Sequence, residues 1–164
     1  MKGRYILAFI IFDNMKKTEI QRLIDTLSHT FEKNAWHGPA VLEALEGVSA
    51  EQANQRFRDS HSILELVMHI TAWRKFVCEK LEGNAEYDVS DEMNFPSEGN
   101  WKQAIETLKK SQVRLLKLLE QTPLERLEEK VPGRPFKFSI MLHGIIHHDL
   151  YHTGQIILLK KDRH

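Results

Sequence analysis

Apolar side chains recur three or four residues apart along almost the whole chain, which is the spacing of one buried face of an α-helix. Strand-like alternation of useful length is confined to residues 4–12. The pattern therefore favours an all-α fold whose long helices bury their apolar faces against one another. The predicted helices are a short one at about 40–46 and long ones at about 17–33, 62–81, 101–121 and 139–160.

Helix-breaking residues separate these segments and set the expected architecture. Pro39 can open the short helix and Gly47 can end it. Residues 82–100 are rich in Gly, Pro, Ser, Asn and Asp and are predicted to form a loop, and residues 122–137 form a second connection. The sequence thus predicts a four-helix bundle with a short helical insert between the first two long helices. Its two longest connections follow the first and second long helices, which allows a topology other than up-down-up-down.

The composition is typical of one soluble domain, which we place at residues 15–164. Hydrophobic residues make up 41% and charged residues 28% of the 164 residues. Basic and acidic residues number 23 each, so the net charge gives no reason to expect a nucleic acid or a membrane as partner. Cys78 is the single cysteine and cannot form an internal disulfide, which favours a cytoplasmic location.

The first fourteen residues are treated separately, as an N-terminal extension of uncertain status. Lys2 and Arg4 precede the apolar run 5–12, which resembles a short signal peptide. The run is too short to span a bilayer as a helix, and no small-residue cleavage site follows it. Met15 is an alternative start, and the run could also pack on the domain or on a partner subunit. We expect residues 1–14 to be an extension of a cytoplasmic protein rather than a secretion signal.

The most informative residues are two histidines near the C-terminus and one in the second long helix. His148 and His152 are four residues apart, so that on a helix they lie about 40° apart on one face. That face is otherwise mostly apolar and should point into the bundle. His69 lies on the apolar face of its own helix and should also point inward. Three inward imidazoles could bind one divalent metal, with zinc or nickel the best matches, and leave a position open for water or substrate.

Other readings of these residues stay open. His69 taken alone could be a hydrogen-bonded core histidine. His143 and His147 form a second pair, but it points roughly 100° or more away from His148, so we expect an interface or surface role for them. The sequence from His148 to His152 has the outline of the H-E-x-x-H metalloprotease motif with Asp149 in place of glutamate, and the shorter acid makes a peptidase a poor match.

Three segments resemble the DinB-like (DNA-damage-inducible) superfamily, which includes the YfiT-like metal hydrolases. They are Ala35-Trp-His-Gly-Pro-Ala40, Ser62-Ile-Leu-Glu-Leu-Val-Met-His-Ile-Thr-Ala-Trp73 and His147-His-Asp-Leu-Tyr-His-Thr-Gly-Gln-Ile156. The resemblance implies a four-helix bundle, a homodimer and one metal ion per subunit. By position it also implies His69, His148 and His152 as the metal ligands.

The resemblance further implies a function for such a site. Some DinB-like proteins use a low-molecular-weight thiol such as bacillithiol, which the metal ionises for attack on a small electrophile. The leading hypothesis is therefore a metal-dependent thiol S-transferase, in which Gln155 and Tyr151 could orient substrate or a ligand. The alternatives are a non-catalytic, metal-stabilised stress-related dimer or binding module, and a metal-dependent hydrolase.

Overall fold

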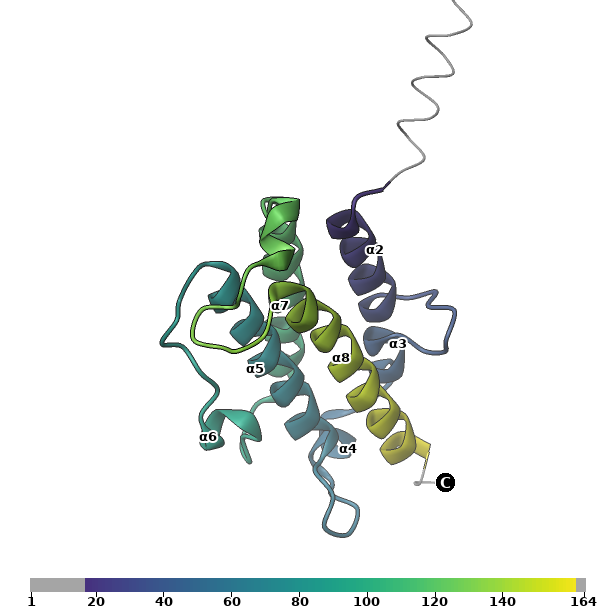
Figure 1. Ribbon diagram of the computed structural model, residues 1–164. Helices are drawn as coiled ribbons and strands as arrows, with labels where there is room; N and C mark the ends of the chain where they lie inside the picture. The colour runs from purple at the N-terminus through teal and green to yellow at the C-terminus, as the bar shows by residue number, and fades with distance from the viewer. Residues whose placement is uncertain (1–16, 162–164) are drawn as a thin grey trace, which may run out of the picture.

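The computed structural model describes residues 17–161, and within them the fold is all-α (Figure 1). The predicted extension at 1–14 lies outside the described residues. No strand occurs in the described part of the chain, although an isolated antiparallel bridge joins Lys130 to Lys137. The elements are α2 (Glu19–Phe31), α3 (Val41–Leu45), α4 (Ala50–Asn54), α5 (Ile63–Leu81), α6 (Asp91–Asn94), α7 (Trp101–Glu120), the 3₁₀ helix η1 (Leu124–Glu128) and α8 (Phe138–Lys161).

The four long helices α2, α5, α7 and α8 form the predicted bundle. Both α5 and α2 pack against α7 and α8, so α5 and α2 lie at opposite corners. Figure 1 shows α5 and α7 running in the same direction, with α2 and α8 running the other way. The long connection at 82–100 therefore returns along the length of α5 before α7 begins. The bundle is thus not a simple up-down-up-down one, as the long connections allowed.

Local capping explains where the helices begin. The hydroxyl of Ser62 accepts from the backbone N–H of Glu65 at 3.2 Å, and the Glu65 carboxylate accepts from the N–H of Ser62 at 2.8 Å. This capping box satisfies backbone donors that the first turn of a helix otherwise leaves unpaired. The same arrangement opens α2 at Thr18 and α4 at Ser49, and the Asn100 side chain caps α7. The long helices consequently begin and end within two residues of the predicted bounds.

Two short elements interrupt connections that the sequence predicts as irregular. The helix α6 lies within the predicted loop, where the Ser90 hydroxyl accepts from the backbone N–H of Met93 at 3.3 Å. The 3₁₀ helix η1 lies within the second connection. Both elements are too short to produce a hydrophobic period, which explains why the apolar spacing does not predict them.

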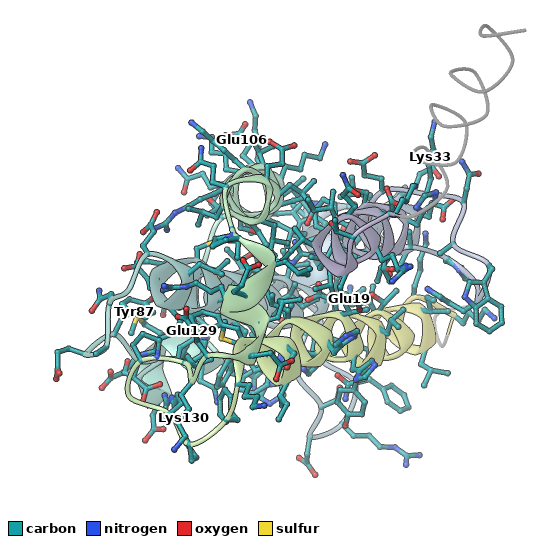
Figure 2. All side chains as sticks on the ribbon, turned by 45° about the horizontal axis from the view of Figure 1, so that its top comes forward. Glu19, Lys33, Tyr87, Glu106, Glu129 and Lys130 are labelled. Atoms are coloured by element: carbon teal, nitrogen blue, oxygen red, sulfur yellow. The ribbon has the colours of Figure 1, made fainter. Side chains whose placement is uncertain are left out.

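The hydrophobic core has two parts. One contains the later part of α5 and the start of α8, and the other contains the start of α5 and the end of α8. Most charged side chains are exposed, and Figure 2 shows Glu106 on the outer side of α7. Between the two parts, every long helix contributes to a layer of buried polar contacts.

Arg74 of α5 is the centre of this polar layer. Its guanidinium donates to the Asp149 carboxylate of α8 at 2.5 Å, and both side chains are fully buried. It also donates to the side-chain oxygen of Gln112 in α7, whose amide nitrogen donates to the carbonyl oxygen of Leu27 in α2 at 3.3 Å. The guanidinium lies 4.4 Å from the ring centre of Phe31. Because a lone buried charge is costly, these contacts tie the four helices to one relative placement.

The first prediction concerns this ion pair. Arg74→Met or Asp149→Leu alone leaves the other charge buried without its partner, so each should lower the free energy of unfolding by about 3–5 kcal/mol. The double variant should lose less than either single variant, because no isolated charge remains. Urea unfolding of metal-stripped protein measures all three.

A matched surface change provides the control for this prediction. Arg114 pairs with Glu79 and Glu82 at the exposed side of α5 and α7. Arg114→Met should therefore change the free energy of unfolding by less than about 1 kcal/mol. Single core variants that behave like this control would contradict the role given to the buried pair.

Candidate metal centre

The structure brings together the three histidines that the sequence analysis selected. His69 comes from α5, and His148 and His152 come from successive turns of α8. Their ring centres are 4.5–4.8 Å apart, and one nitrogen of each lies within 4.8 Å of the others. His69 and His152 are buried, whereas the side chain of His148 is 23% exposed. The cluster is thus closed on the core side and reaches solvent through His148.

Hydrogen bonds at the far nitrogens set the direction of two imidazoles. His69 Nδ1 lies 2.6 Å from the carbonyl oxygen of Asn94, which can only accept, so that this nitrogen carries the proton. His152 Nδ1 lies 2.6 Å from the side-chain oxygen of Gln155 and is protonated in the same way. Each ring therefore keeps an unprotonated Nε2 available on the side of the cluster, as metal-binding histidines require.

The nitrogens facing one another also fit a cation. His148 Nε2 is 2.9 Å from His69 Nε2, so at most one proton can occupy the space between them. Two nitrogens bound to one tetrahedral zinc ion at about 2.0–2.1 Å are roughly 3.3 Å apart, which is close to this separation. His148 Nδ1 is buried and has no hydrogen-bond partner in the described part of the chain, and Asp149 Oδ1 lies 3.7 Å from it. Three side chains arranged in this way could hold a metal ion.

Two aromatic side chains pack against His69, Phe95 from just after α6 and Trp73 from α5. The ring of Phe95 stacks on the His69 ring with 3.9 Å between centres and an angle of 5°. Trp73 meets the same imidazole edge-on and donates its indole N–H to the Asn94 side chain at 3.0 Å. Asn94 therefore holds both His69 and Trp73. Neither Asn94 nor Phe95 was selected from the sequence, and the one local signal for their position was Ser90 as a helix cap before Asp91.

Burial favours the neutral form of His69 and His152. It lowers the pKa of His69 from its ordinary value of 6.5 to about 4, and the neighbouring His148 and His152 lower it further while the bond to Asn94 opposes the shift. Burial also lowers the pKa of His152, against the bond to Gln155. Neutral imidazole is the form that binds metal, so the lowered pKa values of His69 and His152 favour metal binding by these two residues.

The remaining candidate residues do not offer a further ligand to the cluster in this structure. Asp149 is committed to Arg74 and fully buried, so it cannot act on water in the manner of the acid in H-E-x-x-H proteases. His143 and His147 are exposed on the outer side of α8, as expected from the helical wheel. Tyr151 is 66% exposed and touches the site through edge-on contact with the His152 ring at 5.0 Å between centres.

Comparison with protein families agrees with this architecture. The family model of the DinB superfamily matches residues 19–156, which contain all four long helices but for the last residues of α8. The chain belongs to the DinB superfamily. Comparison with curated proteins found no match, and comparison with solved structures found none either. The family is therefore established by its own model together with the bundle.

The second prediction tests the three histidines of this DinB-superfamily protein as ligands. Purified wild-type protein should contain about one divalent ion per chain, and His69→Ala, His148→Ala and His152→Ala should each lose most of it. Elemental analysis measures the metal content. His143→Ala, which changes an exposed histidine of the same helix, should keep the wild-type content. Equal metal in the wild type and in His148→Ala would reject His148 as a ligand.

The third prediction is a pH dependence of the metal-stripped protein. The unfolded chain binds a proton at His69 near pH 6.5 and the folded chain only near pH 4. The unfolded state therefore takes up more protons between these values, and stability falls as the pH is lowered through this range. Between about pH 7 and pH 5 this single group should cost about 1–2 kcal/mol.

The measurement is the urea midpoint at the two pH values for the wild type and for His69→Gln, which has no imidazole to titrate. The variant should lose less stability than the wild type over this interval, whatever its absolute stability. Identical losses would show that protonation of His69 is not opposed by folding.

Proposed function

We propose that this DinB-superfamily protein is a divalent-metal-dependent S-transferase that joins a low-molecular-weight thiol, of the bacillithiol type, to a small electrophile. The observation that carries the proposal is the convergence of three imidazoles in a cluster that reaches solvent on one side. Three protein ligands leave an ion with at least one further position, whereas a closed structural zinc site has four. Such a position would admit a thiol or water.

Zinc or nickel, at one ion per subunit, is the metal that we propose. Neutral imidazole nitrogens suit both ions, and His69, His148 and His152 would be the ligands. A bound ion would lower the pKa of a thiol that it contacts, so that a nucleophilic thiolate forms near neutral pH. The sulfur would then form a bond to the electrophilic carbon, the leaving group would depart with its electron pair, and the thiol proton would pass to solvent.

The protein's own contribution would be to orient the imidazoles and to keep water away. Asn94 and Gln155 hold the Nδ1 protons of His69 and His152, which fixes the rings. Trp73 and Phe95 cover the cluster with aromatic surface. Fixed ligand positions and an apolar covering would both favour binding of a thiol at the ion over binding of water.

Two alternative functions have less support from the site. Metal-dependent hydrolysis would need a general base beside the ion, and the carboxylate next to His148 in the sequence is bound to Arg74 instead. A non-catalytic role, in a metal-stabilised stress-related dimer or binding module, would use an ion as a link between α5 and α8. Activity measurements separate these alternatives from a transferase.

We further propose that the protein is a cytoplasmic homodimer whose subunits meet through the outer face of α8. Ile140 and Tyr151 lie along this face and are 61% and 66% exposed. Exposed apolar side chains aligned on one helix are typical of an interaction surface. Analytical ultracentrifugation reports the oligomeric state directly.

The buried and unpaired Cys78 agrees with a reducing compartment, as expected for a cytoplasmic protein. In the described part of the chain, no helix combines the length and the apolar character needed to cross a membrane.

The fourth prediction tests the transferase. Zinc- or nickel-loaded protein, incubated with bacillithiol and 1-chloro-2,4-dinitrobenzene, should form the thioether and release chloride at least about tenfold faster than metal-stripped protein. The absorbance of the dinitrophenyl thioether follows the reaction. His148→Ala should lower the rate to that of metal-stripped protein, while His143→Ala should not. No rate above the metal-stripped level with several electrophiles would favour the non-catalytic alternative.

A further inference from the structure

A cavity of about 320 Å³ lies next to the histidine cluster, between the α4–α5 connection, the start of α5 and the last turns of α8. The connection projects below the bundle in Figure 1. This volume is at the lower end of the range for small-molecule sites, which span roughly 300–1,000 Å³. The cavity therefore suits a small organic molecule and is too small for a folded partner.

Two side chains connect the cavity to the histidines. Gln155 lines the cavity, and its side-chain oxygen binds the Nδ1 proton of His152. His61 also lines the cavity, and its ring stacks on Phe95 with 3.8 Å between centres. Phe95 in turn stacks on His69, so that the three rings form one continuous stack. A molecule in the cavity would consequently lie beside the residues that hold two of the three imidazoles.

The cavity wall offers two hydrogen-bond donors, from Gln155 and Ser60. The side-chain oxygen of Gln155 is used by His152, which leaves its NH₂ group as the donor end of the side chain. The Ser60 hydroxyl is shielded from solvent and also has no partner among residues 17–161. A buried hydroxyl without a partner is costly unless a ligand pairs with it. Both groups can donate to a ligand atom that accepts.

The rest of the wall is apolar. Leu66 and Leu159 form its inner part and are buried, whereas Phe57 and Leu158 stand at its rim and are 43% and 66% exposed. A few polar groups placed in an apolar lining are the usual composition of a site that orients a small ligand. The apolar part supplies affinity, and the donors select the orientation.

We propose that this cavity binds the electrophilic substrate, as a small and largely apolar molecule whose hydrogen-bond acceptor, such as a carbonyl or nitro oxygen, pairs with Gln155 and Ser60. This orientation places the polarised end of the molecule toward the histidines and the apolar end toward the rim. The description of the ligand as the electrophile rests on the proposed transferase function. The cavity and its donors do not depend on that function.

The fifth prediction tests binding without any thiol, with acetophenone as the probe and ethylbenzene as its counterpart of similar shape without an acceptor. In methyl-labelled full-length protein, about 1 mM acetophenone should shift the methyl signals of Leu66, Leu158 and Leu159. Ethylbenzene at the same concentration should shift them at least about threefold less, because it leaves the donors unpaired. Equal shifts from both compounds would overturn the assignment of an acceptor-bearing ligand.

Variants at the rim test the location of the site. Phe57→Ala and Leu158→Ala should each raise the dissociation constant of acetophenone about fivefold or more, because they remove exposed apolar wall without opening the core. Val113→Ala is the matched control, since it changes a similarly exposed apolar residue of α7 that does not line the cavity. Ser60→Ala should reduce the preference for acetophenone over ethylbenzene. Unchanged binding in both rim variants, or shifts only at other methyl groups, would overturn the proposal.

The outcome is independent of the transferase assay. Acetophenone binding at this cavity in a protein that shows no transfer would reject the transferase and retain the binding site. Transfer activity whose KM for the electrophile is the same in the wild type, Phe57→Ala and Leu158→Ala would retain the transferase and reject the cavity as its substrate site.

Discussion

The ion pair between Arg74 and Asp149 is the contact on which the arrangement of this bundle depends. Both side chains are fully buried, and the guanidinium also reaches Gln112, which binds the carbonyl of Leu27. Hydrophobic faces alone would permit neighbouring helices to slide by a turn with little loss of apolar contact. A buried charge separated from its partner is far more costly, so the pair selects one placement of α5 against α8.

That placement also determines the geometry of the candidate metal centre. Asp149 directly follows His148, and Arg74 lies little more than a turn beyond His69, so the same register that joins the charges brings the imidazoles together. Asn94 and Gln155 then fix the rings from outside the cluster. The site is thus assembled from a rigid framework of α5 and α8 and an outer layer from the α6 region. This separation is typical of sites whose ligands are held by neighbouring hydrogen bonds.

Helical spacing in the sequence was enough to predict the bundle and to select His69, His148 and His152, because each is set by its position on its own helix. Asn94 and Phe95 could not be predicted in the same way. They contact His69 from a distance of 25 and 26 positions along the chain, and α6 is too short to leave a period. Asp149 could not be given a role from the sequence, where it matched a metalloprotease motif only poorly. Its buried partner Arg74, 75 positions away along the chain, makes it a structural residue.

The amino-acid sequence by itself determined the helices, their buried faces and the inward direction of three imidazoles, because periodicity and capping act over a few neighbouring residues. Tertiary structure alone decided which helices are neighbours, which nitrogen of His69 carries the proton and where the cavity beside Gln155 lies. These features depend on side chains that are distant in the sequence and meet when the buried charges and apolar faces of the bundle are satisfied together.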